Sequence, residues 1–263
     1  MALLELVRKL PYNHPYRWDG RLFGKPKLWT PSEISTAAWY DAYDLSTIVQ
    51  SGGFVSQWSD KSGNARHATQ PTGTYQPKTG GSINGLNAIK GSGPNGNPHM
   101  SVSGSGTIKT CFGVAKVGST RTAEIAILGS RTKVGSDNEF FVRKQSTQIS
   151  FDGTSSTKGK FRVNGGTESG SVEDASDATV GSGNPFLIQG TFDSTTTLGA
   201  ILGRTDLGVG PSTVEVVGEI IWLSGTASTA DRQKLEGYLA WKWGLQGNLP
   251  AGHPYKSTPP IVA

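Results

Sequence analysis

The densest run of polar side chains lies at residues 57–67, where the sequence is QWSDKSGNARH. Asp60, Ser62 and Asn64 alternate along this run, and side-chain oxygens of this kind are the ligands that calcium prefers. The same residues can also close a tight turn, because Asp and Asn side chains bond to nearby backbone and Gly63 tolerates a positive φ. A structural turn is the simpler interpretation, and a calcium site is the alternative.

Paired carboxylates would indicate glycan hydrolysis, since a retaining glycosidase needs two carboxyl groups about 5 Å apart. Glu215 and Glu219 share one strand face, but four residues along a strand span about 13 Å. Asp41 and Asp44 point to opposite faces if the strand around Asp41 continues. The motifs of serine hydrolases, zinc proteases, P-loop proteins and dinucleotide-binding enzymes are also missing from the sequence. We therefore expect no enzyme activity.

Histidine and cysteine offer no further reactive centre. The four histidines stand apart, without a second histidine or an acid at ligand spacing: His14, His67, His99 and His253. Cys111 is the one cysteine, so neither an intramolecular disulfide nor a cysteine-based zinc site can form. We expect no resident cofactor, and calcium at Asp60, Ser62 and Asn64 is the one ion to test.

Aromatic rings are the remaining candidates for ligand contact, because an exposed Trp or Tyr can stack on a sugar. Tyr43, Trp58 and Tyr75 are the possible platforms. Most of the seven Trp residues in a chain of this size belong to a core or an interface. Sugar contact at these three residues is therefore a hypothesis.

Composition excludes several protein classes. Charged residues make up 17% of the 263 residues, below the roughly 25% typical of globular domains, and 36 Gly and 14 Pro disfavour a helical bundle. No window approaches about 18 consecutive apolar residues, and residues 1–10 contain three charges where a signal peptide needs an apolar core. The net charge is +5, but the 25 Lys and Arg residues are scattered and form no run, which favours solubility over nucleic-acid binding. We expect neither membrane insertion nor a nucleic-acid partner.

Short, turn-bounded apolar segments recur along most of the chain and predict strands. Several alternate with period two, for example Phe161 and Val163 against Arg162. The expected strands are residues 37–44, 54–60, 107–117, 123–130, 139–145, 148–153, 160–166, 185–193, 197–203 and 214–225. Strands at this spacing predict an all-β fold, a two-sheet antiparallel jelly-roll sandwich.

One long helix is expected near the C-terminus. Ser228 and Asp231 form a capping-box-like pair at its start, and Gly244 is placed to end it. Apolar residues recur at three- and four-residue spacing between them: Leu235, Tyr238, Leu239 and Trp243. The stripe predicts a helix that packs against the sandwich.

The first 30 residues differ from the rest and predict an extended anchoring arm. Prolines at 11, 15 and 26 break regular elements, so the arm's aromatics must dock onto this chain's own domain or onto a neighbouring subunit. These aromatics are Tyr12, Tyr16, Trp18, Phe23 and Trp29. The expected organisation is arm 1–30, sandwich domain 31–257 and tail 258–263.

A motif in the arm is repeated near the C-terminus. Residues 10–17 (LPYNHPYR) and 249–256 (LPAGHPYK) share the pattern L-P-x-x-H-P-Y-basic, each after a candidate helix. A recurrent helix-terminating turn is the simpler explanation. The alternative is that the arm occupies, on another subunit, a groove like the one that the C-terminal copy occupies on its own.

Two stretches resemble a known family. They are WSDKSGNARHATQ at residues 58–70 and EGYLAWKWGL at residues 236–245, within a similarity that covers about residues 28–257. The chain resembles the concanavalin A-like, laminin-G-like domains of bacteriophage structural proteins. The resemblance implies a two-sheet jelly roll, Asp60 and Asn64 in a structural turn, a helix packed on the sandwich, and no shared catalytic residues.

The expected function follows from this resemblance together with the arm. We expect a virion accessory protein, a head decoration or a tail appendage, made in the host cytoplasm and attached to other capsid or tail proteins. A homo-oligomer whose sandwiches face outward could also bind cell-surface glycans by avidity. A free carbohydrate-binding module is the alternative, and a glycoside hydrolase is a weaker one.

Overall fold

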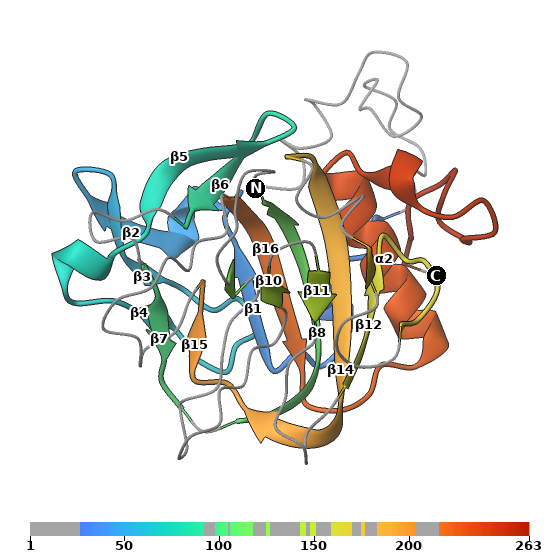
Figure 1. Ribbon diagram of the computed structural model, residues 1–263, viewed down its shortest axis with the longest axis horizontal. Coiled ribbons are helices and arrows are strands. Elements are labelled where there is room, and N and C mark those ends of the chain that lie inside the picture. Colours follow the sequence, from blue (N-terminus) through green and yellow to red (C-terminus); the bar gives the residue numbers. More distant parts are fainter. Residues whose placement is uncertain are drawn as a thin grey trace.

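The described part of the chain is a predominantly antiparallel β structure with one α-helix near its C-terminal end (Figure 1). The computed structural model describes residues 27–91, 98–104, 106–117, 125–126, 143–145, 148–150, 159–169, 175–176, 183–202 and 216–262. No helix among these residues is long and apolar enough to cross a membrane.

Each of the ten expected strand segments contains a strand. The strands are β1 (Ala38–Asp41), β2 (Ile48–Ser51), β3 (Phe54–Trp58), β4 (Ala68–Thr69), β5 (Lys78–Ile83), β6 (Leu86–Lys90), β7 (Met100–Val102), β8 (Thr107–Lys116), β9 (Ile125–Ala126), β10 (Arg143–Gln145), β11 (Gln148–Ser150), β12 (Gly159–Val163), β13 (Ala175–Ser176), β14 (Pro185–Thr197), β15 (Ala200–Ile201) and β16 (Val216–Leu223). The helices are α2 (Thr229–Lys242) and the short 3-10 turns η1 (Pro31–Glu33), η2 (Leu45–Thr47), η3 (Gly73–Tyr75) and η4 (Gln246–Asn248).

The main sheet is long and folds over on itself. Its order is β12-β14-β8-β16-β6-β5-β3-β4-β7-β15, while β1 pairs with β16 and β2 pairs with β3. The β5–β6 hairpin joins the half that contains β16 to the half that contains β3. A separate four-stranded sheet has the order β13-β11-β10-β9.

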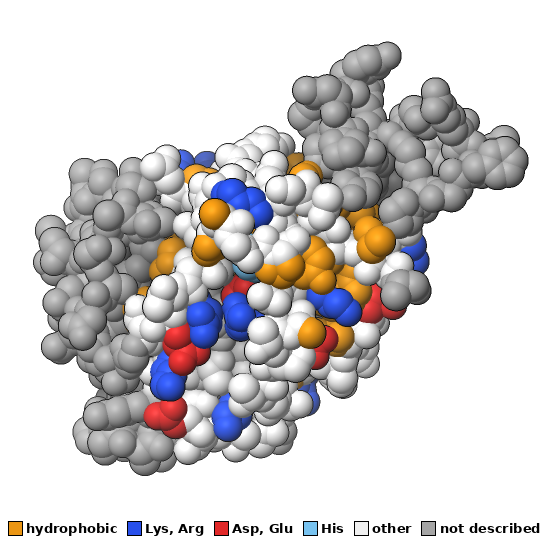
Figure 2. Space-filling model, turned by 90° about the vertical axis from the view of Figure 1, so that its right-hand side faces the viewer, with side chains coloured by type: hydrophobic (Ala, Val, Ile, Leu, Met, Phe, Trp, Pro, Cys, Tyr) orange, Lys and Arg blue, Asp and Glu red, His pale blue; other side chains and the backbone are white. Residues whose placement is uncertain are grey.

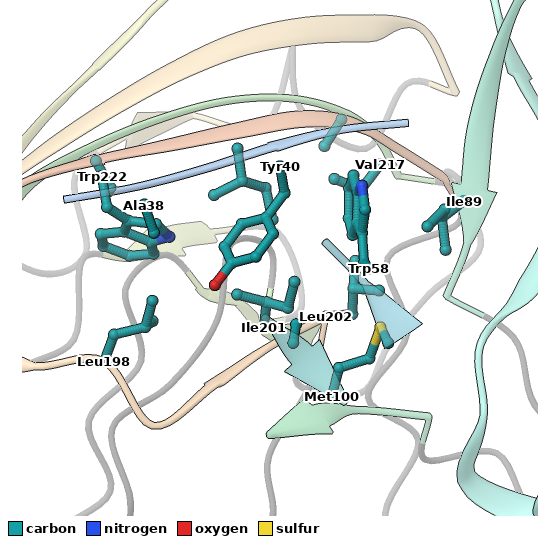
Figure 3. Close-up of a cluster of buried hydrophobic side chains, with 14 of the residues drawn as sticks. Ala38, Tyr40, Trp58, Ile89, Met100, Leu198, Ile201, Leu202, Val217 and Trp222 are labelled. Carbon is teal, nitrogen blue, oxygen red and sulfur yellow. The ribbon is translucent and has the colours of Figure 1, made fainter. Parts of the chain in front are cut away.

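The two halves of the main sheet enclose an apolar core, which gives a sandwich-like arrangement. Figure 3 shows Tyr40 of β1 and Trp222 of β16 on one side, facing Met100 and Ile201 from the other half. The Tyr40 and Trp58 rings lie 5.6 Å apart at their centroids. The apolar residues of the alternating strand patterns, such as Phe161 of β12, point into this inner core.

The helix α2 covers the opposite face of the β16 half. Its apolar stripe is buried against side chains of β8, β14 and β16, as the residue spacing predicted. Gly218 lies beneath this helix at an irregularity in the register of β16, and a Cβ there would approach the Trp243 ring to 2.7 Å. The glycine thus permits the indole of Trp243 to lie directly on the strand.

Both ends of α2 agree with the sequence prediction. The Ser228 hydroxyl accepts a hydrogen bond from the Asp231 backbone N–H at 3.0 Å and donates to the Asp231 carboxylate at 2.8 Å. Gly244 follows the helix with a φ of +69°, a conformation that favours glycine. The predicted capping residues are confirmed.

The two ends of the described chain lie side by side. The Trp29 N–H donates to the Pro260 carbonyl at 3.0 Å, and the Val262 N–H donates to the Lys27 carbonyl at 2.8 Å. Trp29 is buried, and its ring packs edge-on against that of Tyr238, with the ring centroids 6.3 Å apart. The end of the predicted arm therefore contacts the predicted tail and the helix.

Candidate functional site

The polar run at residues 57–67 forms a hydrogen-bonded turn that holds the start of β1. One Asp60 carboxylate oxygen accepts from the backbone N–H groups of Trp39 and Ser62, both at 2.8 Å. The other oxygen accepts from the Ser62 hydroxyl at 2.7 Å and from the Arg66 N–H at 3.1 Å. A cation at Asp60 would have to displace these donors.

Asn64 extends the same turn. Its side-chain amide donates to the backbone carbonyls of Thr36 at 2.9 Å and Ala37 at 3.1 Å, and Gly63 has a φ of +86°. Among the described residues, no group of three or more His, Cys, Asp or Glu side chains could hold a metal ion. Of the two interpretations, a structural turn and a calcium site, the hydrogen bonds of Asp60, Ser62 and Asn64 match the structural turn.

The three candidate sugar platforms lie in different surroundings. Trp58 is fully buried in the inner core, so neither face of its ring is open to a ligand. Tyr43 is partly buried and packs against the apolar cluster under α2. Tyr75 is partly buried, with its ring 5.5 Å from that of His99. The structure does not bring these rings together into one binding surface.

The arm residues are described only at their C-terminal end. Tyr12, Tyr16, Trp18 and Phe23 lie outside the described residues. Trp29 contacts its own chain through the ring of Tyr238.

A buried carboxylate that the sequence did not single out as a hub lies between β16 and α2. Glu219 is fully buried. One of its oxygens accepts from the indole N–H of Trp39 at 2.7 Å and the Tyr238 hydroxyl at 3.0 Å. The other accepts from the Lys242 ammonium at 2.7 Å and the indole N–H of Trp243 at 2.8 Å. Two donors at each oxygen leave this carboxylate no free direction toward a substrate.

A chain of ion pairs leads from Glu219 to the surface. Lys242 contacts both Glu219 and Asp41 at 2.7 Å, and these two acids face each other across the β1–β16 pair. Asp41 also meets Lys61 at 3.0 Å, and Lys61 meets Asp44 at 2.8 Å. The condition placed on Asp41 and Asp44 does not hold: β1 ends at Asp41, the chain turns, and both acids converge on one ammonium.

Burial and the two lysines set the charge states of this network. Burial raises the pKa of Glu219, and the Lys242 ammonium opposes that effect. Burial also disfavours ionised Asp41, but Lys242 and Lys61 together hold the pKa of Asp41 below its usual range. The pKa of Asp44 is lowered against its partial burial by hydrogen bonds from Lys61 and Ser46. The lysines thus favour the ionised forms of Asp41 and Asp44, whereas burial favours the protonated form of Glu219.

Replacing Asp44 by asparagine tests this electrostatic description. A carboxyl whose pKa is lower in the folded state stabilises the fold above its ordinary pKa, 3.8 for Asp44, and loses that effect as the pH falls through the lowered value. We expect Asp44→Asn to cost a few tenths to about 1 kcal/mol at pH 6 and to cost progressively less below about pH 4. Urea midpoints at pH 6 and pH 2.5 measure the difference, and an equal cost at both pH values would contradict the assignment.

A second buried acid anchors the C-terminal copy of the repeated motif. Glu236 is fully buried and binds Arg232 through both oxygens at 2.8 and 2.9 Å, and it lies 3.0 Å from His253 Nε2. Tyr255 packs so closely on Gly237 that a Cβ there would lie 2.6 Å from the Tyr255 Cβ. The residues of LPAGHPYK thus dock onto the chain's own helix. The corresponding residues 10–17 lie outside the described part.

An open cleft of about 370 Å³ lies where the N-terminal end of α2 meets β12, β14 and β8. It is on the side of the molecule that bears α2 and β12, where basic and acidic side chains are interleaved across the surface (Figure 2). The cleft is lined by Lys109, Lys160, Arg162, Glu168, Gln189, Thr191, Phe192, Asp193, Thr226, Ala227, Thr229 and Arg232. Side chains able to donate or accept hydrogen bonds dominate this lining.

A break in strand pairing shapes the cleft. Thr191 of β14 pairs with Thr110 of β8, but the next pair joins Thr196 to Ile108, so residues 192–195 oppose Lys109 alone. The extra residues include the exposed Asp193. Bulges of this kind redirect side chains beside binding sites. No local pattern indicates this break, because the pairing of β14 with β8 joins segments about 80 residues apart.

The chain was compared with family models, with curated proteins and with solved structures. No family model, curated protein or solved structure matches this chain.

Proposed function

We propose that this chain is a non-catalytic accessory protein of a bacteriophage particle, with a concanavalin A-like jelly-roll sandwich that faces outward and residues 1–30 as its attachment arm. In this proposal the arm contacts other virion proteins and the sandwich binds glycans. The observation that carries the non-catalytic part is the saturation of Glu219, whose two oxygens each accept two hydrogen bonds inside the fold.

The stretches that carry the family resemblance support a structural role. In the first stretch, Asp60 and Asn64 bond to the backbone around β1. In the second, Lys242 and Trp243 bond to Glu219. These residues hold β1, β16 and α2 together, as expected of a display scaffold whose stability depends on its core.

The attachment role is supported by the contacts at both ends of the described chain. Residues 27–29 are held by residues 260–262 and by the burial of Trp29. The arm therefore joins the sandwich at a fixed point next to α2. His253 and Tyr255 contact α2 at Glu236 and Gly237. The similar motif at residues 10–17 would dock on a partner protein through contacts of the same kind.

A cosedimentation experiment tests the attachment. Full-length protein carrying Tyr16→Ser, Trp18→Ser and Phe23→Ser is compared with the unmodified chain for binding to particles of the virus that encodes it. We expect the unmodified chain to sediment with the particles and the triple variant to lose at least 90% of that binding, because large aromatics dominate interface energies. Leu45→Ser is the matched control, since Leu45 is an exposed apolar residue on the sandwich.

The polar cleft favours a second candidate function, a free carbohydrate-binding module. The cosedimentation result also distinguishes this candidate from a virion protein. Equal sedimentation of the triple variant, or no sedimentation of either chain, would reject the attachment arm. A monomer in light scattering that binds sugar but not particles would support the free module. Circular dichroism of each variant checks that the sandwich remains folded.

A further inference from the structure

The strongest unassigned feature is the buried contact of one lysine with two carboxyl groups. The Lys242 Nζ lies 2.7 Å from an oxygen of Asp41 and 2.7 Å from an oxygen of Glu219. The side chains of Lys242 and Asp41 are each 5% exposed, and Glu219 is fully buried. An amine that is held against a carboxyl group, away from bulk water, is in the arrangement from which an amide bond forms.

The fold holds the two groups on separate, fixed elements. Asp41 is the last residue of β1 and lies opposite Glu219 of β16, and Lys242 is the last residue of α2. The Asp41 Cγ is one carbon–oxygen bond beyond the Oδ1 atom that Lys242 contacts. Well-oriented groups of this kind react with effective concentrations of about 10⁵–10⁸ M, which offsets much of the barrier to a bond between them.

Aromatic rings separate the contact from water. The Lys242 Nζ lies 5.4 Å from the centroid of the Tyr238 ring and 5.6 Å from that of the Trp243 ring. An ion pair in such surroundings has lost the hydration of both charges, whereas an amide is neutral and loses much less. Replacement of the Lys242–Asp41 ion pair by an amide therefore removes a desolvation cost from the fold.

Glu219 is placed to carry a proton during the reaction. Burial raises the pKa of Glu219 against the effect of the Lys242 ammonium, so this carboxylate takes up a proton more readily than an exposed one. Its Oε2 accepts a hydrogen bond from Lys242, and that bond can reverse its direction without movement of either side chain. The Trp39 indole and the Tyr238 hydroxyl hold the other oxygen. Glu219 thus touches a reacting atom inside the fold, although it is closed to an external substrate.

Asp41 is the carboxyl group that suits attack, because a second cation faces it. The Lys61 Nζ lies 3.0 Å from Asp41 Oδ2, where it stabilises the negative charge of a tetrahedral intermediate. The Tyr43 backbone N–H holds Oδ1 at 3.1 Å. Lys61 also pairs with Asp44, and these two side chains are 22% and 21% exposed. Water released at Asp41 is therefore nearest to the surface on this side.

We propose that Lys242 and Asp41 form an intramolecular amide bond, with Glu219 as the catalytic base and acid. The structure shows the ion pair from which the reaction starts. The Lys242 ammonium gives one proton to ionised Glu219, and the neutral amine attacks the Asp41 Cγ. Glu219 then returns that proton to Oδ1, which takes a second proton from the nitrogen and leaves as water. One ammonium and one carboxylate become one amide and one water, and Glu219 ends in its starting form.

The bond would enclose residues 41–242 in one covalent ring. The ring contains strands β2 to β16 and fastens the end of β1 to the end of α2. Cross-links that close long loops stabilise a fold by restricting its unfolded state. The reaction occurs once in each chain and turns over no external substrate. It goes beyond the proposed function and does not rest on it, because it is measured on the purified chain without particles or sugars.

Intact mass spectrometry of the full-length chain tests the proposal. We expect the folded chain to be lighter than its sequence mass by one water molecule. A tryptic digest should contain residues 28–61 joined to residues 235–256, because trypsin does not cleave after an acylated lysine. A folded chain that keeps its full sequence mass after prolonged incubation at neutral pH would overturn the proposal. A loss of water that maps to other peptides would also reject it.

Three variants assign the roles. Lys242→Arg keeps the positive charge but removes the amine, and Glu219→Gln keeps the shape but cannot accept the proton, so both should retain the full sequence mass. Lys256→Arg is the matched control, because the Lys256 Nζ contacts the carbonyl oxygens of Gly247 and Leu249 and no carboxyl group; it should still lose water. Loss of water from Lys242→Arg would refute the bond, and its persistence in Glu219→Gln would refute the catalytic role. Circular dichroism checks that each variant is folded, and the mass of the unmodified chain decides the proposal where a variant does not fold.

Discussion

Replacing Glu219 by alanine is expected to lower the free energy of unfolding by about 3–5 kcal/mol, the usual cost of removing one partner of a buried ion pair. Glu219 is fully buried and accepts hydrogen bonds from Trp39, Tyr238, Trp243 and Lys242. Its loss leaves two indole N–H groups and a hydroxyl without their acceptor and removes one of the two carboxyl groups that contact Lys242. Urea denaturation followed by tryptophan fluorescence measures the effect.

A matched control and a double variant show whether the loss of stability in Glu219→Ala comes from the buried interaction with Lys242. Glu33→Ala removes an exposed carboxylate that pairs with Lys27 at 2.6 Å, and it should cost less than about 1 kcal/mol. Glu219→Leu combined with Lys242→Met should cost less than the sum of the two single changes, because it removes both charges together. If Glu219→Ala kept nearly full stability but abolished turnover of a polysaccharide, Glu219 would be a catalytic residue and the non-catalytic assignment would be wrong.

Replacing Asp60 by alanine is expected to cost about 2–3 kcal/mol, since charged acceptors contribute more than neutral ones and their removal leaves donors unpaired. The carboxylate accepts from the backbone of Trp39, Ser62 and Arg66 and from the Ser62 hydroxyl. Loss of these bonds frees the turn that holds the start of β1. Asp193→Ala, at an exposed carboxylate of the cleft, is the matched control and should change the urea midpoint little.

The same measurement decides between the turn and the calcium site. The urea midpoints of the unmodified chain and of Asp60→Ala should be the same in excess chelator and in millimolar calcium. A midpoint that rises with calcium in the unmodified chain, and not in Asp60→Ala, would show that Asp60 binds the ion.

Local patterns predicted those parts of the fold that depend on neighbouring residues. The limits of α2 follow from Ser228, Asp231 and Gly244, whose effects act within one helical turn. The long strands β8, β14 and β16 were expected because their apolar runs are bounded by turn residues. The short strands β4 and β7 and the glycine-containing β5 were missed, since a few residues with low strand propensity form strands only through their partners.

The site depends on contacts that no local pattern contains. Asp41 and Glu219 meet because β1 pairs with β16 across most of the sequence, so spacing along one strand could not reveal them. His253 and Glu236 meet across the docking of the C-terminal segment. Arg162 and Gln189 lie opposite each other only through the register of β12 with β14. Trp58 shows the reverse case, because its position in the sequence does not distinguish a core ring from a sugar platform.

The pairing of residues 27–29 with residues 260–262 also bears on how the chain could be rewired. A short peptide linker between these two segments would span ends that are already in hydrogen-bonding distance, so it would add little strain. New ends could then be opened at the Gly52–Gly53 turn, where both glycines have positive φ and Gly52 is exposed, with no atom within 4 Å of a Cβ built on it. A circular permutant of this kind would keep the sandwich while moving the chain ends from the side of α2 to the β2–β3 hairpin.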